Sequence, residues 1–247
     1  MPVIIGGIGD TISNRPINPP IQPTAIDWTK RAAKTTELGS ARSSMMLPNL
    51  QSVFEPIPED WDDNRLMRMR CDSQSMHFYG DISHYLVRRF TEFETMSVLD
   101  VGARTGAGTA LLRLLHHPWA YTRLKFDPVV ALDLEPDVVR FVQHEFRDIT
   151  AICEDVHNIA DNSYDLVICS HTIEHLYEVQ PFINQLERVA RRAVLVACPI
   201  DEKEPLTEGH FQRLTAEGLE KLGFQDIEVY ESFQFHNGKC GIAIKYL

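Results

Sequence analysis

The chain has 247 residues, of which 44% are hydrophobic and 24% charged, and this size and composition suit one sizeable globular domain with an appended segment. Its formal net charge of −11 argues against long nucleic acid as a partner, because phosphate binding needs clustered Lys and Arg side chains. The five cysteines are scattered and lack C-x-x-C spacing, which favours free thiols. No apolar run is long enough to span a membrane, and the N-terminus lacks the charged start of a secretory signal. The sequence therefore predicts a cytoplasmic protein.

The first 60 residues differ from the rest of the chain, because they hold eight of its fourteen prolines and show no helical or strand period. This pattern predicts an irregular Pro-rich N-terminal arm over residues 1–60, which packs over the domain or crosses to a second copy in a homo-oligomer. A partly disordered tail is the alternative. Residues 61–247 are then expected to form the folded domain.

A glycine-rich turn opens a pattern of alternating strands and helices. Residues 97–109 run SVLDVGARTGAGT, which is an apolar strand carrying Asp100, a loop with three glycines, and part of a helix expected over 105–115. This layout lets the backbone approach a ligand closely at the carboxyl end of a parallel strand. No lysine follows the glycines, as a P-loop requires, and the spacing fails the G-x-G-x-x-G dinucleotide pattern. The turn therefore favours a nucleoside ligand without a diphosphate.

The other elements are expected in a regular order around this turn. A helix with Asp81 as its N-cap leads into the strand that begins at Ser97. After a polar and aromatic linker over 116–128, the sequence predicts a strand over 129–132, a helix from 136, strands over 149–153 and 166–170, a helix over 182–190, a strand over 193–198, a helix capped at 215, and two last strands over 227–230 and 241–245 in an antiparallel hairpin. Strands that alternate with helices predict an α/β fold with a mostly parallel sheet.

Three acidic residues fall at the ends of successive predicted strands. Asp100 lies in the first strand, Asp133 ends the second, and Asp155 follows the third. A carboxylate that ends the second strand suits the hydroxyls of a ribose, and one after the third can accept a hydrogen bond from an adenine amine. Each alone would be read as a solvated surface group, but their order along the sheet edge favours a nucleoside site.

Four stretches of the sequence resemble the class I S-adenosylmethionine-dependent methyltransferases of the broad small-molecule type: VLDVGARTGAG, VVALDLEP, ICEDVHNIADNSYDLVICSHTIEHL and GHFQRLTAEGLEKLGF. The resemblance implies a Rossmann-like, seven-stranded, mostly parallel sheet sandwiched by helices, with S-adenosylmethionine as the cofactor above the glycine turn. By position, the resemblance assigns the ribose of the cofactor to Asp133 and Leu134 and its adenine to Asp155 and Val156. It implies that Ser170 lines the methyl-transfer end. The residues implied around the methionine part are Asp100, Gly102, Ala103, Arg104, Thr105 and Gly106.

The sequence departs from the family pattern in two places. Arg104 stands where such proteins usually have glycine, and we expect its side chain to point away from the ligand. The linker over 116–128 lengthens the distance between Gly102 and Asp133, as an insertion would. A relative that binds the cofactor without catalysis, as a partner subunit, therefore stays an alternative.

The segment from His171 to His175 is a second concentration of reactive side chains. His171, Glu174 and His175 lie at positions i, i+3 and i+4, so on a helix they would share one face. As text this matches the H-x-x-E-H zinc protease signature, but the chain has no other protease feature. Within the methyltransferase resemblance, these side chains either pack and line the pocket or join His210 to bind a divalent cation. Related O-methyltransferases that act on ubiquinone precursors or on the terminal ribose of small RNAs resemble the second arrangement.

The sequence thus predicts methyl transfer to a hydroxyl of a small molecule or saccharide, with N-methylation of a small amine as the alternative. A hydroxyl acceptor needs a base, and histidine suits that role near neutral pH. His171 and His210 are the candidate bases, and Glu174 and His175 complete the candidate catalytic set. We expect residues 199–202, after the fifth strand, to face the acceptor. Four other histidines are expected at the surface: His116, His117, His144 and His157.

Overall fold

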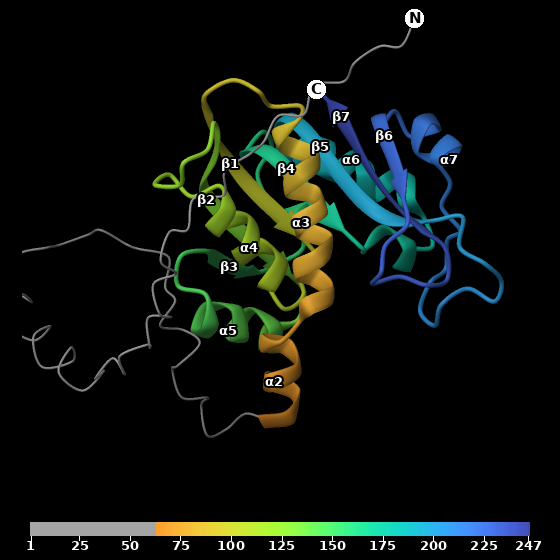
Figure 1. Cartoon of the computed structure of the whole chain (residues 1–247), viewed down its shortest axis with the longest axis horizontal. Coiled ribbons are helices and arrows are strands. Elements are labelled where there is room, and N and C mark those ends of the chain that lie inside the picture. The colour runs from red at the N-terminus through yellow and green to blue at the C-terminus, as the bar shows by residue number, and fades with distance from the viewer. Residues whose placement is uncertain (1–62) are drawn as a thin grey trace, which may run out of the picture. The chain divides into compact units, whose positions relative to one another are not determined.

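A computed structural model of the chain describes residues 63–247 (Figure 1), which belong to one compact unit. The proposed Pro-rich arm over 1–60 lies outside the described residues. Within them the order of strands and helices follows the predicted alternation. No helix in the described part is long and apolar enough to cross a membrane.

The centre of the fold is a seven-stranded sheet with the strand order β3-β2-β1-β4-β5-β7-β6. The first five strands are parallel, and β7 lies antiparallel between β5 and β6, so the expected hairpin is confirmed. This is the Rossmann-like, mostly parallel sheet that the sequence predicts. The strands are β1 Glu94–Val101, β2 Leu124–Asp133, β3 Thr150–Cys153, β4 Tyr164–Ser170, β5 Ala190–Ile200, β6 Gln225–Tyr230 and β7 Lys239–Tyr246.

Helices cover both faces of the sheet (Figure 1). One face packs against α3, α4 and α5, and the other against α6 and α7. The helices are α2 Asp63–Arg70, α3 Ser73–Val87, α4 Ala107–Leu115, α5 Pro136–Glu145, α6 Val179–Val189 and α7 Ala216–Lys221, with short 3-10 turns η2 Val156–Asn158 and η3 Ile173–His175.

The core divides into two layers because side chains alternate along each strand. In β1, Met96 and Val98 join the cluster under α3 and α4, whereas Leu99 and Val101 join the cluster under α6 and α7. The central strands are buried on both faces, which explains their nearly continuous apolar runs. Because β1 to β5 are parallel, their carboxyl ends lie at one edge of the sheet, where the candidate site is found.

Helix α3 begins earlier than the sequence predicts. Its N-cap is Asp72, whose carboxylate accepts hydrogen bonds from the backbone N–H of Ser75 at 3.1 Å and from the Ser75 hydroxyl at 2.7 Å. The prediction of Asp81 as the cap was wrong, because the apolar stripe of the helix already starts at Phe78 and ends before Phe93, which is 81% exposed.

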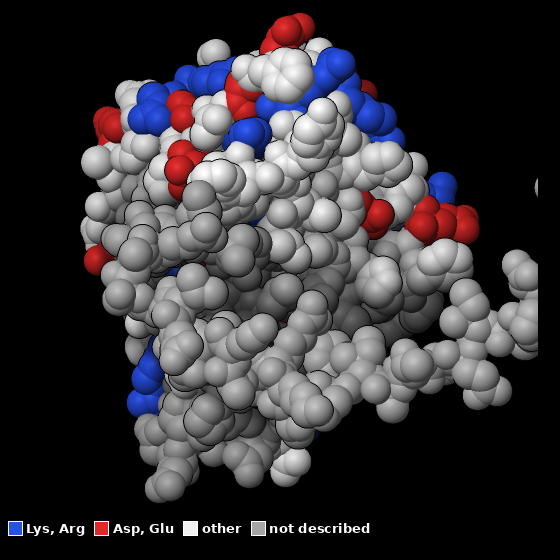
Figure 2. All heavy atoms as spheres, turned by 60° about the vertical axis from the view of Figure 1, so that its left-hand side comes forward, with Lys and Arg blue, Asp and Glu red and all other residues white. Residues whose placement is uncertain are grey.

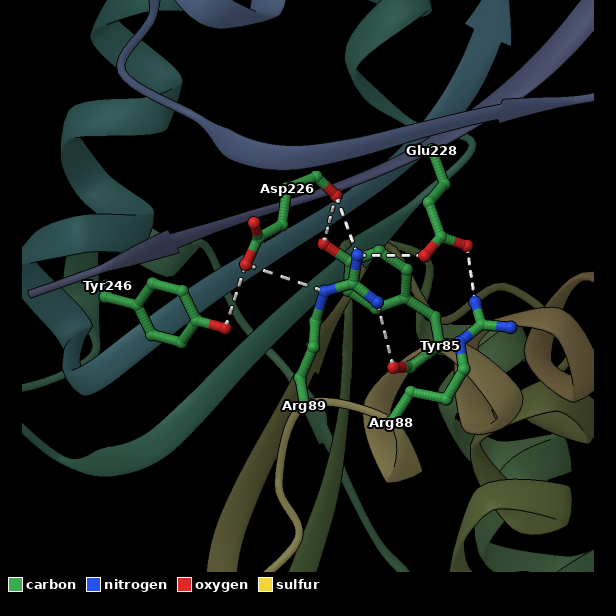
Figure 3. A network of polar contacts seen from close by, with 6 residues as sticks. All are labelled: Tyr85, Arg88, Arg89, Asp226, Glu228 and Tyr246. Carbon is green, nitrogen blue, oxygen red and sulfur yellow. Dashed lines mark hydrogen bonds and ion pairs between the residues drawn. The ribbon is translucent and has the colours of Figure 1, made fainter.

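A polar network fixes the C-terminal end of α3 to β6 at the sheet edge (Figure 3). The guanidinium of Arg89 lies 3.4 Å above the centre of the Tyr85 ring and donates to Glu228 at 2.9 Å. The Tyr85 hydroxyl donates to the Asp226 carbonyl at 2.8 Å, and Arg88 forms a second ion pair with Glu228. The N-terminal half of α3 lies beside the glycine turn, so this network fixes the helix that bounds the candidate site.

The expected linker over 116–128 is largely structured. Its last residues belong to β2, which begins at Leu124 and pairs with β1 through a register shift between Met96 and Val98. His116 and His117 are buried, contrary to the surface position expected for them. The His116 ring bridges the Ser83 hydroxyl and the Leu124 carbonyl, and burial lowers its pKa. The sequence did not show this burial, because Ser83 and Asp148, which His116 and His117 contact, lie outside the linker.

The described surface in Figure 2 carries Lys and Arg side chains interleaved with Asp and Glu side chains along its upper rim. This mixed pattern on the visible face differs from the broad basic field that phosphate backbones attract.

Candidate functional site

The glycine turn connects β1 to α4. Three of its residues have left-handed backbone conformations: Gly102, Arg104 and Gly106, with φ of +75°, +50° and +69°. A Cβ at Gly102 would overlap the Thr172 side chain, and one at Gly106 would approach Val142 at 2.7 Å. Both glycines are therefore required by their backbone angle and by close neighbours. Arg104 adopts the same region with a full side chain.

Asp100 lies beneath this turn rather than at the surface of a cavity. Its carboxylate is fully buried and accepts hydrogen bonds from the Tyr79 hydroxyl at 2.7 and 2.8 Å, and from the Thr109 hydroxyl. Burial raises the pKa of Asp100 to about 6, although both hydrogen bonds oppose that rise. Asp100 therefore acts on the site through Tyr79, whose ring lines the cavity above.

A cavity of about 500 Å³ opens above the turn, at the carboxyl ends of β1, β4 and β5. It is bounded by the first half of α3, by the segment after β4 and by the loop after β5. Its lining includes Tyr79, Gly102, Ala103, Arg104, Ser170, His171, Glu174, His175, Pro199, His210 and Phe235. The structure thus brings most of the predicted catalytic and methyl-transfer residues to one place.

Unpaired polar atoms concentrate in this cavity. Among the described residues, five buried side-chain nitrogen or oxygen atoms lack a hydrogen-bond partner, and three of them line it: Ser170 Oγ, His171 Nε2 and Glu174 Oε2. A buried polar atom without a partner is destabilising, so such atoms usually belong to a ligand site. Their clustering marks this cavity as the functional one.

His171 is held in an unusual conformation at the end of β4. Its φ is +50°, and its ring stacks on Phe78 with centroids 3.7 Å apart. Its Nδ1 lies 3.5 Å from Glu174 Oε1, and its Nε2 is buried without a hydrogen-bond partner. Strained backbone of this kind persists where the surroundings fix it, frequently at functional sites.

Glu174, His175 and His210 form a compact group whose ligand atoms all lie within 4.8 Å of one another. The Nδ1–H of His175 donates to the Gly209 carbonyl at 2.8 Å, and that of His210 donates to Glu202 at 2.7 Å. In the neutral form of each ring, Nε2 is then the nitrogen that can bind another partner. The expected shared helix face is absent, because residues 173–175 form a single 3-10 turn and His171 lies outside the group. The H-x-x-E-H protease motif requires a helix that places its residues on one face, and this segment does not form one.

Glu202 is the residue whose role the sequence missed. It was expected to face the acceptor, but it is 1% exposed and accepts from Thr207 N at 2.7 Å and Asn237 Nδ2 at 3.1 Å as well as from His210. Burial alone would raise its pKa, but these hydrogen bonds outweigh burial and lower it. Its position eight residues before His210 was the available signal, although only the fold shows that the two side chains meet.

A second cavity of about 360 Å³ lies between the glycine turn, α2 and the start of α5. Asp133 lines it, and its two oxygens accept from the backbone N–H groups of Arg104 at 2.9 Å and Glu135 at 3.0 Å. Thr105 lines this cavity too, whereas Arg104 lines both cavities. Arg104 is thus the residue of the turn that the two cavities share, and its φ is +50°.

The remaining predicted cofactor residues lie further along the same edge. Leu134 is 68% exposed after β2, Val156 is buried, and Asp155 caps η2 by accepting from the backbone N–H of His157 at 2.9 Å. This hydrogen bond and a second one from the His157 ring lower the pKa of Asp155. None of the three lines either described cavity, and neither does Gly106.

Known proteins share both the sequence pattern and the fold. Residues 99–198 match the family model of a methyltransferase domain. A solved S-adenosylmethionine-dependent methyltransferase of Aquifex aeolicus is similar with a TM-score of 0.52 and 19% identity, over 76% of this chain and 99% of that one. The magnesium protoporphyrin IX methyltransferase of Synechocystis PCC 6803, solved with bound SAH, is similar with a TM-score of 0.54 and 15% identity, over 88% and 95% of the two chains. No curated protein sequence matches the chain.

The matched segment runs from β1 to β5 and contains the glycine turn, Asp133, Asp155 and the His171 to His175 segment. The solved structures support the same seven-stranded fold. Residues 99–198 thus match a methyltransferase domain, and the described part of the chain has the fold of these solved methyltransferases.

Proposed function

We propose that the protein is a methyltransferase that transfers the methyl group of S-adenosylmethionine to a hydroxyl of a small molecule or saccharide, and that a divalent cation binds at the acceptor. The observation that carries the proposal is the group of Glu174, His175 and His210, whose donor atoms converge beside the cavity above the glycine turn. A neutral amine acceptor would need neither a metal nor a strong base, so this group favours oxygen as the acceptor atom.

In this proposal the cofactor would lie along the carboxyl edge of the sheet. Gly102 to Gly106 would surround its methionine part, Asp133 and Leu134 its ribose, Asp155 and Val156 its adenine, and Ser170 the transfer end. When bound, S-adenosylmethionine supplies an electrophilic methyl group on a sulfonium. The unpartnered Ser170 Oγ supports this placement, because it lies in the cavity between the glycine turn and His171.

The donor set suits a divalent cation by its chemistry. Two neutral imidazoles and one carboxylate are ligands that zinc, manganese and iron accept. Hydrogen bonds from each Nδ1–H to an oxygen, here Gly209 and Glu202, are the usual supports of metal-binding histidines. Glu174 Oε2 is buried and has no partner of its own. A cation here would lower the pKa of an acceptor hydroxyl.

His171 is the group best placed to take the acceptor proton. His171 lines the cavity, its Nε2 has no hydrogen-bond partner, its Nδ1 lies 3.5 Å from Glu174, and its ring stacks on Phe78. The His210 base considered from the sequence is less suitable, since His210 belongs to the cation group. Glu174, His175 and His210 would thus hold the cation at the acceptor, and His171 would accept the proton.

Cofactor binding is tested by calorimetric titration of the full chain with S-adenosylhomocysteine. Asp133→Ala should weaken binding at least tenfold, because it removes the ribose acceptor and the oxygens that join the two loops. Asp137→Ala, an exposed carboxylate of α5, is the matched control and should bind as the wild type does. An Asp133→Ala variant with unchanged affinity contradicts the placement. Binding without turnover over a broad acceptor panel favours the non-catalytic partner subunit instead.

The cation is tested separately by titration with Mn²⁺, followed through water-proton relaxation. Glu174→Gln, His175→Ala and His210→Ala should each lose most of the binding, and His84→Ala, which removes an exposed histidine of α3, should keep it. Equal Mn²⁺ binding in all variants, or full methyl transfer after chelation and dialysis, would refute the cation. Methyl transfer to amines alone would move the assignment to N-methylation.

A further inference from the structure

Aromatic rings form a large part of the wall of the cavity above the glycine turn. The lining residues that carry such a ring are Phe78, Tyr79, His171, His175, His210 and Phe235. The three histidines have roles in the proposed function, the Tyr79 hydroxyl is bonded to Asp100, and Phe78 stacks on His171. Phe235, from the loop between β6 and β7, is the ring that the proposed function leaves without a role.

The loop between β6 and β7 is anchored on both sides of Phe235. Before it, the Gln234 carbonyl accepts a hydrogen bond from the Gln74 side chain of α3 at 3.0 Å. After it, Asn237 Nδ2 donates to the buried Glu202 carboxylate at 3.1 Å. The loop thus ties Phe235 to two other walls of the same cavity, the start of α3 and the loop after β5.

Phe235 places an apolar surface next to the candidate cation group. Its ring is nearly parallel to that of His210, with 19° between the planes and 6.4 Å between the centroids. It is partly buried against the cluster under α3 and α4, and it lines the cavity together with His210. An acceptor whose hydroxyl reaches the Glu174, His175 and His210 group therefore has Phe235 beside its carbon skeleton.

Most hydroxyl and amide side chains in the lining are engaged with other parts of the protein. Four of the five donate a hydrogen to a protein acceptor: Gln74 to the Gln234 carbonyl, Ser75 to Asp72, Tyr79 to Asp100 and Thr207 to Glu202. The buried polar atoms without a partner belong to Ser170, His171 and Glu174, at the end of β4. A saccharide carries hydroxyls around its ring, and each needs a partner when buried. A flat ring with a hydroxyl at one end needs partners at that end only.

We propose that the acceptor is an aryl hydroxyl compound whose flat ring stacks on Phe235 while its hydroxyl meets the cation group and His171. This inference rests on the proposed function and names its acceptor class. An aryl hydroxyl such as that of tyrosine has a pKa of about 10, against about 16 for water, so its oxygen becomes a nucleophile with less help. Its proton passes to His171 Nε2 and its oxygen forms a bond to the methyl carbon, while the carbon–sulfur bond breaks and the electron pair stays on sulfur.

Calorimetric titration of the full chain with three probes tests the acceptor class. The probes are 2-naphthol, its saturated and non-planar counterpart decahydro-2-naphthol, and methyl α-D-glucopyranoside. The wild type should bind 2-naphthol more tightly than the glucopyranoside. Phe235→Leu, which keeps an apolar side chain but removes the ring, should weaken 2-naphthol binding by at least about twofold and leave decahydro-2-naphthol binding unchanged. Phe233→Leu, at a 91% exposed position of the same loop, is the matched control and should bind all probes as the wild type does.

The aryl acceptor is overturned if 2-naphthol does not bind, or if the glucopyranoside binds more tightly than 2-naphthol in the wild type. It is also overturned if Phe235→Leu weakens 2-naphthol binding by less than about twofold, or weakens both bicyclic probes equally. Methyl transfer to a saccharide hydroxyl without 2-naphthol binding keeps the proposed function and refutes this acceptor class. The expected pattern of 2-naphthol binding without methyl transfer to any acceptor refutes the proposed function, and the stacking site at Phe235 stands.

Discussion

The carboxylate of Glu202 accepts a hydrogen bond from the Nδ1–H of His210 at 2.7 Å, inside a loop where the carboxylate is 1% exposed. An ionised carboxylate has no proton to donate, so the hydrogen in this contact is on His210 Nδ1. In the neutral ring, Nε2 is then left for the group with Glu174 and His175. The loop after β5 thereby becomes part of the candidate cation site.

Glu202→Gln should weaken Mn²⁺ binding by about tenfold to a hundredfold, because the amide no longer fixes the imidazole and no longer raises its basicity. S-adenosylhomocysteine affinity should stay unchanged, which separates this effect from a general loss of structure. Glu204→Gln, an exposed residue of the same loop, serves as the control. Mn²⁺ affinity equal to that of the wild type would show that Glu202 supports only the loop.

Gly108→Ala should destabilise the fold by about 1–3 kcal/mol, because the added Cβ would overlap the Tyr79 ring. The ring has little freedom to move, since its hydroxyl is bonded to both oxygens of Asp100. Gly80→Ala places the same methyl group on the neighbouring helix α3, where nothing lies within 4 Å. That variant should gain up to about 1 kcal/mol from helix propensity. Urea unfolding of the two variants compares them, and equal changes would contradict the packing of Tyr79 on α4.

The raised pKa of Asp100 makes stability depend on pH in a defined direction. A folded pKa of about 6 lies above the reference value of 3.8, so the group stabilises the fold below pH 4 and this contribution is lost as the pH rises through 6. The loss amounts to about 3 kcal/mol at most. Asp100→Asn cannot titrate and should lack this component, as measured by urea unfolding from pH 4 to 7. Asp137→Asn, at the surface, should follow the wild type. Parallel profiles for wild type and Asp100→Asn would rule out the titration.

Arg89→Ala should lower the free energy of unfolding by about 1–2 kcal/mol, since it removes the cation over Tyr85 and a partly buried ion pair with Glu228. Its neighbour Arg88 pairs with the same glutamate but is 48% exposed, so Arg88→Ala should cost less than about 0.5 kcal/mol. Thermal and urea unfolding measure both. Equal losses would show that charge alone, and not the stacking in Figure 3, holds α3 to β6.

The sequence by itself determined the order of the elements and the residues at the sheet edge. Apolar runs and turn residues are local signals, so the alternation of strands and helices, the glycine turn and the positions of Asp133 and Ser170 follow from them. One of its errors was also local: Asp81 is a plausible cap by residue type, but Asp72 has the hydroxyl and N–H of Ser75 within reach.

Only the tertiary structure decided which side chains meet. Asp100 is bonded to Tyr79, 21 residues earlier, and His175 to Gly209, 34 residues later, and no periodicity in the sequence records such pairs. Burial then sets their chemistry: the same kind of carboxylate has its pKa raised at Asp100, where desolvation dominates, and lowered at Glu202, where several donors surround it. The turn that organises the site is readable in the sequence, whereas the two cavities that share Arg104 exist only through packing.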